Sequence, residues 1–179
     1  MKAPLIAALT LAATANTALA GGVAFRFGDE TFGASVAGNL NADSSAQLDW
    51  MHHEDDADLV SLGLFANGQR GALTGRVGAK VVTLNADDSG FDGAVAAFGG
   101  DLSLPLSDVL RLRGGLYYGP EAASASDVEG YREWSISTEF AIFQNSALEL
   151  GYADIEFDAE GGGDFDFEDG LFVRLQLRL

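Results

Sequence analysis

Two adjacent histidines are the residues of this sequence with the clearest capacity for chemistry. His52 and His53 precede the acidic run 54–56, and a histidine beside a carboxylate can activate water as a general base. Neighbouring side chains on a strand point to opposite faces, so only one of the two could reach a lumen or groove. The sequence has no other histidine and no serine in a nucleophile elbow. We therefore expect no catalytic residues, and a hydrolase at the outer rim is the least favoured function.

Metal chemistry has equally little support. Zinc or copper would need further ligands beside His52 and His53, and the chain has no cysteine. Residues 85–90 supply the oxygen ligands and glycine of half a calcium loop, but the twelfth position is Ala96 instead of a carboxylate. We expect no metal site and no cofactor. Weak, shared binding of divalent cations is the one alternative to plain solvated loops for the acidic clusters at 54–58, 87–92, 121–129 and 154–169.

The remaining charges follow a pattern that only strands can position. In segment 171–179 the apolar side chains occupy the odd positions, whereas Arg174 and Arg178 occupy even ones. One face of such a strand is hydrocarbon and the other carries two guanidinium groups. The same alternation elsewhere predicts a set of inward-facing lumen charges: Arg76, Lys80, Arg111, Arg113, Arg174, Arg178, Asp49, Asp101, Glu139 and Glu149.

The width of the predicted barrel decides how these charges behave. Eight to ten strands enclose a lumen wide enough only for side chains, and an unpaired charge there would cost several kcal/mol. We expect the charges to pair and form an ionic plug, with a narrow porin-like channel for ions or small solutes as the alternative.

Aromatic residues favour a transmembrane barrel over a soluble one. Trp50, Tyr118, Trp134 and Tyr152 all lie on apolar faces and towards the long-loop ends of their strands. Amphipathic rings at one level are typical of the girdle that a barrel places at the membrane interface.

The fold predicted is an all-β, antiparallel, up-and-down transmembrane β-barrel. Twenty-three glycines and short alternating runs of Val, Leu and Phe favour a meander of strands. Tight turns alternate with longer, acidic connections, so an even strand count, about ten with eight possible, would bring both termini to the short-turn rim. The strands are expected at 22–28, 31–38, 44–53, 57–67, 71–84, 91–104, 109–119, 131–143, 145–158 and 167–179.

The first 20 residues predict that the protein is exported from the cytoplasm. Lys2, an apolar stretch and the small-residue pattern 18–20 form a secretory signal peptide with cleavage after Ala20. Residues 21–179 then make one domain. Removing Lys2 takes the net charge from −17 to −18, which disfavours nucleic acid as a partner.

The chain resembles the YfaZ family of small Gram-negative outer-membrane proteins. The resemblance rests on the signal peptide, on the stretch from 59–64 through 75–80, and on the ending at 169–179. It implies localisation in the outer membrane, with membrane lipids and the barrel-assembly machinery as partners, and it brings no catalytic residues. Barrels of this kind usually end on an aromatic residue, whereas this chain ends on Leu179.

Structural or surface interaction is therefore the function predicted, ahead of a narrow porin and a rim hydrolase. The sequence leaves the ligand and the oligomeric state open.

Cleavage of the signal peptide is directly testable. Because the pattern ends at Ala20, amino-terminal sequencing of the protein purified from an outer-membrane fraction should begin at Gly21. A chain beginning at Met1, or recovered entirely from the soluble periplasm, would contradict this expectation.

Overall fold

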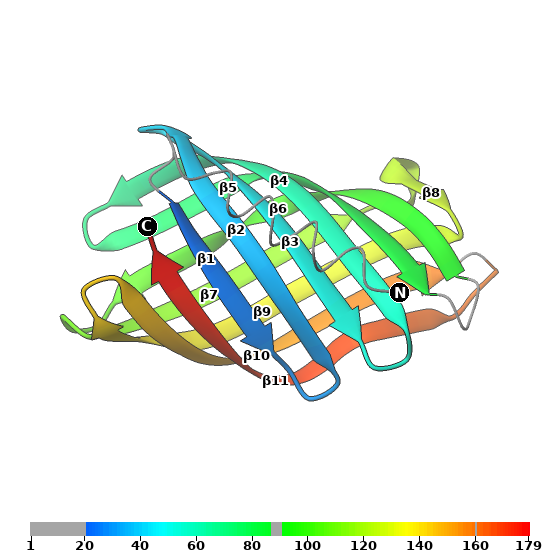
Figure 1. The fold of residues 1–179 in the computed structure, drawn as a ribbon. Helices are drawn as coiled ribbons and strands as arrows, with labels where there is room; N and C mark the ends of the chain where they lie inside the picture. The colour runs from blue at the N-terminus through cyan, green and yellow to red at the C-terminus, as the bar shows by residue number, and fades with distance from the viewer. Residues whose placement is uncertain (1–20, 87–90, 160) are drawn as a thin grey trace.

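Pairing between the first and the last strand closes one antiparallel sheet into a barrel (Figure 1). The computed structural model describes residues 21–86, 91–159 and 161–179, so the predicted signal peptide lies outside the described residues. Val23 in the first strand is opposite Leu177 in the last. The ten barrel strands are β1 (Gly21–Phe27), β2 (Thr31–Asn41), β3 (Ser44–His53), β4 (Ala57–Arg70), β5 (Leu73–Ala86), β6 (Phe91–Pro105), β7 (Leu110–Gly119), β9 (Val128–Phe143), β10 (Ser146–Ala159) and β11 (Asp164–Arg178).

The ten-strand barrel predicted from the sequence is thus confirmed. The two strands expected within residues 22–38 are β1 and β2, and a turn at 28–30 joins them. The Gly28 N–H donates to the Thr31 carbonyl across this turn, at 2.8 Å. The largest differences in strand ends are three residues: β2 and β4 end three residues later than expected, and β9 and β11 begin three residues earlier.

A short extra strand completes the wall beside β6. The 3₁₀-helix η1 (Glu121–Ala123) and β8 (Ser124–Ser126) lie in the connection between β7 and β9. β6 pairs with β7 only from Phe98 onwards, and Val95 pairs with Ser124 instead. β8 therefore continues the hydrogen bonding of β6 beyond the point where β7 ends.

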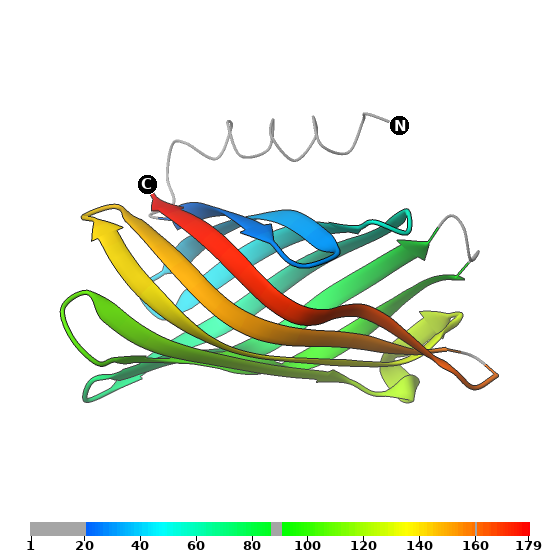
Figure 2. The ribbon, with the colours of Figure 1, turned by 90° about the horizontal axis from the view of Figure 1, so that it is seen from below.

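The barrel has two unlike ends (Figure 2). We call the end with Gly21 and Leu179 the termini rim; its turns are 42–43, 71–72, 106–109 and 144–145. At the opposite end, the loop rim, the connections include 28–30, 54–56 and 120–127. An even number of antiparallel strands brings both ends of the described chain to one rim.

An apolar belt covers the outer surface. Ten of its exposed side chains are Leu62, Leu64, Val77, Val81, Phe98, Leu116, Ile136, Leu171, Val173 and Leu175. They occupy the faces that alternation assigned to lipid. Exposed apolar side chains on six strands are more than the scattered single ones of a soluble monomer, and they match the lipid-facing band of a transmembrane barrel. Among the described residues, no helix is long and apolar enough to span a membrane.

A charge placed in the belt should oppose insertion. Leu175 lies between Phe25 and Leu148 on neighbouring strands, so Leu175→Arg should destabilise the folded barrel by about 2–4 kcal/mol if the side chain meets the bilayer centre. Urea titration of the protein folded into lipid vesicles measures the change.

Ser35→Arg provides the matched control, because Ser35 lies in the lumen directly opposite Asp49 of β3. An arginine there has space and a carboxylate beside it. Equal loss of stability in both variants would show that the outer face does not meet lipid.

Candidate functional site

The inward face of the barrel is asymmetric. β1–β4 line the lumen mostly with small side chains, including Ala24, Gly33, Ser35, Ala37, Ser45 and Ser61. β5–β11 line it with long ones, including Arg76, Lys80, Tyr117, Glu133, Glu149 and Arg174. A cavity of about 620 Å³, which we call the vestibule, remains between the two walls.

The vestibule begins at the termini rim and ends inside the barrel. Gly21 and Leu179 border it at the rim, whereas Met51, Leu59 and Ile155 border it in depth. The last three belong to a buried apolar cluster. The vestibule therefore has an apolar floor.

Two buried glutamates organise the charges on one wall of the vestibule. Glu139 accepts hydrogen bonds from Arg113 and Arg178 at 3.0 Å and from Arg111 at 3.3 Å. Its side chain is only 5% exposed, whereas those of Arg111 and Arg178 are 42% and 48% exposed. One carboxylate thus holds three guanidinium groups in place from the inner side.

Glu149 is the second anchor, and its side chain is 3% exposed. It accepts hydrogen bonds from Ser137 at 2.5 Å and from Gln176 at 2.6 Å. Arg113 and Arg174 each lie 3.4 Å from the same carboxylate. Arg113 therefore links the two glutamates into one cluster of four arginines and two carboxylates.

Deeper in the lumen the charges form separate pairs. Arg76 pairs with Asp101 at 2.5 Å, and the Tyr117 hydroxyl donates to the same carboxylate at 2.7 Å. Lys80 pairs with Glu133. Arginine or lysine is thus matched to one acid in each pair, as burial requires.

Eight of the ten charges expected in the lumen border the vestibule, and the other two, Arg111 and Glu139, pair with each other. The ten do not all pair within the expected set. Lys80 pairs with Glu133, which was outside the expected set although it shares a face with Glu139. Asp49 has no basic partner within ion-pair distance among the described residues; Gln47 and Ser61 donate hydrogen bonds to it. With Glu133 included, the acids of this lumen set nearly balance its bases.

Sequence reasoning also missed the pair Arg26 and Glu168. Their side chains are 9% and 3% exposed and lie 2.7 Å apart. Arg26 lies between the outward Phe25 and Phe27, so alternation could have found it. Glu168 had been assigned to an acidic outer cluster, and this was wrong: a β-bulge shifts the register of β10 and β11, so that Phe167 and Glu168 are both buried.

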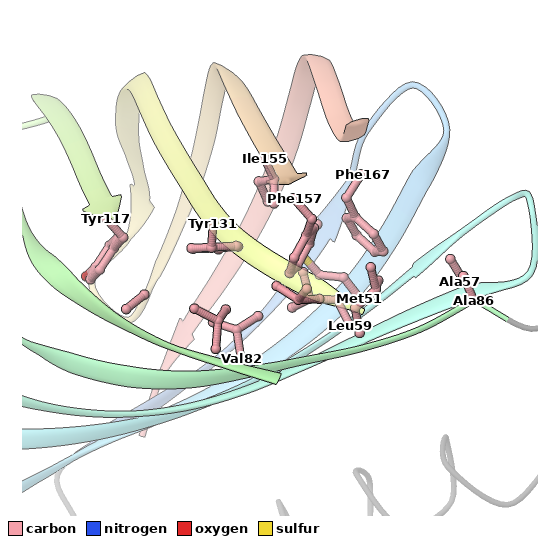
Figure 3. Packing of buried hydrophobic residues seen from close by; sticks show 14 of the residues in the cluster. Met51, Ala57, Leu59, Val82, Ala86, Tyr117, Tyr131, Ile155, Phe157 and Phe167 are labelled. Carbon is pink, nitrogen blue, oxygen red and sulfur yellow. The ribbon is translucent and has the colours of Figure 1, made fainter. Parts of the chain in front are cut away.

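An apolar septum occupies the lumen towards the loop rim (Figure 3). The septum is the buried cluster Met51, Ala57, Leu59, Phe65, Val82, Leu84, Ala86, Val95, Ala97, Tyr117, Val128, Tyr131, Ile155, Phe157 and Phe167. These side chains come from eight strands. Tyr131 and Phe157 pack edge to face, with ring centroids 5.0 Å apart, and Phe157 and Phe167 are fully buried.

No part of the sequence reasoning anticipated the septum. The signal was present in β10, where Glu149 faces the lumen while Ile155 and Phe157 occupy the same face further along. Asp154, Glu156 and Asp158 alternate with them. From Tyr152 towards the loop rim, therefore, the outward face of β10 is acidic and its inward face is apolar.

The four girdle residues lie on the outer surface. Trp134 and Tyr152 are neighbours, with ring centroids 5.4 Å apart, and Tyr118 is 55% exposed. The Trp50 indole N–H donates to Asp58 at 3.1 Å. Trp50, Tyr118 and Trp134 lie in the halves of their strands nearer the loop rim, whereas Tyr152 lies at the middle of β10.

The two histidines diverge, as neighbours on a strand must. His52 lies outside, 3.1 Å from the Asp58 carboxylate and stacked near Trp50. His53 is 5% exposed and packs against Phe167, and its Nδ1 accepts the backbone N–H of Asp55. The geometry brings no nucleophile to either ring.

The acidic loops offer one close group of carboxylates in the described part of the chain. Glu156, Asp158 and Asp164 place their oxygens within 4.8 Å of one another. Arg132 forms ion pairs with both Glu156 and Asp158, so its single positive charge is already shared between two of the three carboxylates. Residues 87–90 of the calcium-like segment lie outside the described residues.

Comparison with known proteins identifies the relatives of this barrel. The sequence profile of the family described as YfaZ precursor matches residues 1–179. Outer membrane protein YfaZ of Escherichia coli (strain K12) is 32% identical over 148 residues, which cover 82% of this chain and 76% of that protein.

Solved structures of porins have a similar fold at low sequence identity. The KdgM porin in complex with disordered oligogalacturonate matches with a TM-score of 0.50 and 6% identity, over 89% of this chain and 98% of the porin. The outer membrane channel DcaP of Acinetobacter baumannii gives a TM-score of 0.49 and 12% identity, and this chain spans 54% of its length. The family profile and the Escherichia coli relative together establish that the chain belongs to the YfaZ family of outer-membrane proteins.

Proposed function

We propose that this protein is a closed outer-membrane barrel with a structural or surface-interaction role, and that it is not an open channel. The septum carries the proposal, because one buried cluster joins apolar side chains from eight strands inside the barrel. Burying one large apolar side chain stabilises a protein by about 1.5–3 kcal/mol. A permanent water path would have to displace several of them.

The ion pairs around Glu139 and Glu149 also support a closed barrel. Glu139 and Glu149 draw four guanidinium groups onto one wall. Charges fixed by mutual pairing act as a brace between β7, β9, β10 and β11. In this proposal the ten charges predicted from the sequence stabilise the barrel and line the vestibule, and they do not conduct ions through the membrane.

The orientation proposed places the loop rim outside the cell. Short turns face the periplasm in barrels of this class, so the termini rim and the vestibule would open there. The acidic outer surfaces of β10 and β11 would then stand above the lipid headgroups, with Trp50, Tyr118, Trp134 and Tyr152 at the interface. A strongly acidic surface suits contacts with cationic partners or with divalent cations.

A narrow porin is the second candidate, and the vestibule favours it. About 620 Å³ of polar cavity would hold a small solute, and the fold is that of porins. This function would require the septum to open. A rim hydrolase has less support, because His52 and His53 point apart and His53 is buried beside Phe167.

Planar-bilayer recording tests the closed barrel. The wild-type protein should give little or no unitary current, whereas Phe157→Ala combined with Phe167→Ala should give stepwise currents, since two fully buried rings are removed from the septum. Phe143→Ala is the control, because Phe143 is 72% exposed at the termini rim. Heat-modifiable mobility on gels verifies that each variant is folded. Large, stable currents from the wild type would favour the porin.

The bracing role of the glutamates is tested by stability. Glu139→Ala should lower the free energy of unfolding by about 1–3 kcal/mol, because three arginines lose a shared partner. Asp108→Ala, at an exposed turn of the same rim, should leave stability unchanged. Unaltered unfolding of the Glu139 variant in denaturant titrations would contradict a bracing role.

A further inference from the structure

One wall of the vestibule carries more positive than negative charges. On this wall Arg111, Arg113, Arg174 and Arg178 form ion pairs, within the described part of the chain, with Glu139 and Glu149 alone. Two positive charges of this cluster are therefore not matched by its own carboxylates. The facing wall supplies small or neutral polar groups such as Ala37, Ser45 and Gln47, and one acid, Asp49.

The arginines also keep most of their donors. A guanidinium group carries five N–H donors, yet towards the described residues those of Arg174 and Arg178 each donate a single hydrogen bond, to Glu149 and to Glu139 respectively. Their side chains are 25% and 48% exposed, and both border the vestibule. Fixed guanidinium donors beside a cavity are the usual means of binding carboxylate and phosphate groups.

The cavity is of the right size and depth for a small molecule. Pockets that bind ligands typically measure about 300–1,000 Å³, and the vestibule measures about 620 Å³. Its floor is the septum, so a ligand could enter and leave only through the termini rim. Because the floor is apolar and the wall is basic, the ligand that fits is a compact anion with a short carbon skeleton.

We propose that the vestibule is a binding site for small organic anions carrying a phosphate or carboxylate group, open at the termini rim and held by Arg174, Arg178 and Arg113. That the site is closed at its inner end depends on the closed barrel proposed above. Its preference for anions depends only on the arginine wall. Arg174 and Arg178 supply free donors, and Arg113 is fixed between the two glutamates.

Three probes with the same three-carbon skeleton but different charge test whether binding depends on the charge of the ligand. Titration calorimetry of the folded protein in neutral detergent at low salt should show binding of glycerol 3-phosphate, weaker binding of glycerate and none of glycerol. Raising the salt concentration should weaken binding, because the attraction is screened. Failure of glycerol 3-phosphate and glycerate to bind, or equal binding of glycerol, would overturn the proposal.

Arg174→Gln is the most informative variant. Glu149 keeps Arg113, Ser137 and Gln176 as donors when Arg174 is removed, so the barrel should still fold. Loss of one charged hydrogen bond should weaken glycerol 3-phosphate binding about tenfold or more. Arg132→Gln, at an exposed position that does not line the vestibule, should leave binding unchanged.

A variant that fills the cavity separates the site from the ion pairs. Ala24 borders the vestibule on the small-residue wall and takes part in no ion pair, so Ala24→Phe should abolish binding without removing a charge. Unchanged affinity in both Arg174→Gln and Ala24→Phe would place the anion elsewhere and refute the site. Large wild-type currents together with intact binding would instead refute only the closed barrel.

Discussion

The whole structure depends on the alternation of side chains in a sheet that has closed on itself. In a closed barrel each strand presents every second residue to the lumen and the others to the surroundings. Closure by β1 and β11 removes the free edges, so the position of a residue in the sequence decides which medium it meets. Near the termini rim this separates an apolar exterior from a charged interior. Towards the loop rim the same geometry separates an acidic exterior from an apolar interior.

This exchange of chemistry along the barrel divides its lumen. Where lipid covers the outside, the interior is the only place for polar groups, and they pair around Glu139 and Glu149. Where the wall is acidic outside, the interior can form an ordinary apolar core around Tyr131, Phe157 and Phe167. The vestibule and the septum are thus consequences of one pattern, since each strand passes through both environments.

Side-chain size then determines where space is left. The small-residue wall of β1–β4 faces the long arginines and glutamates of β5–β11. Close packing needs side chains that fill the space from both walls, and the small side chains of β1–β4 leave part of it empty as a cavity. The bulge in β11 adds a local exception: it turns two consecutive residues, Phe167 and Glu168, into the interior. One of them completes the septum and the other neutralises Arg26.

The sequence by itself determined the strands, their even number, and which face of each meets lipid, because a period of two is a local property of the chain. It also placed Arg76, Lys80, Arg113, Arg174, Glu139 and Glu149 on inward faces. Only the tertiary structure decided the partners, since Lys80 and Glu133 or Arg26 and Glu168 are distant in sequence and meet through the closed sheet. The septum likewise required it: Val82, Tyr131 and Phe157 look like any apolar strand residues until eight strands bring such side chains into one buried cluster. Packing across a lumen is a non-local property, and no pattern within a single strand contains it.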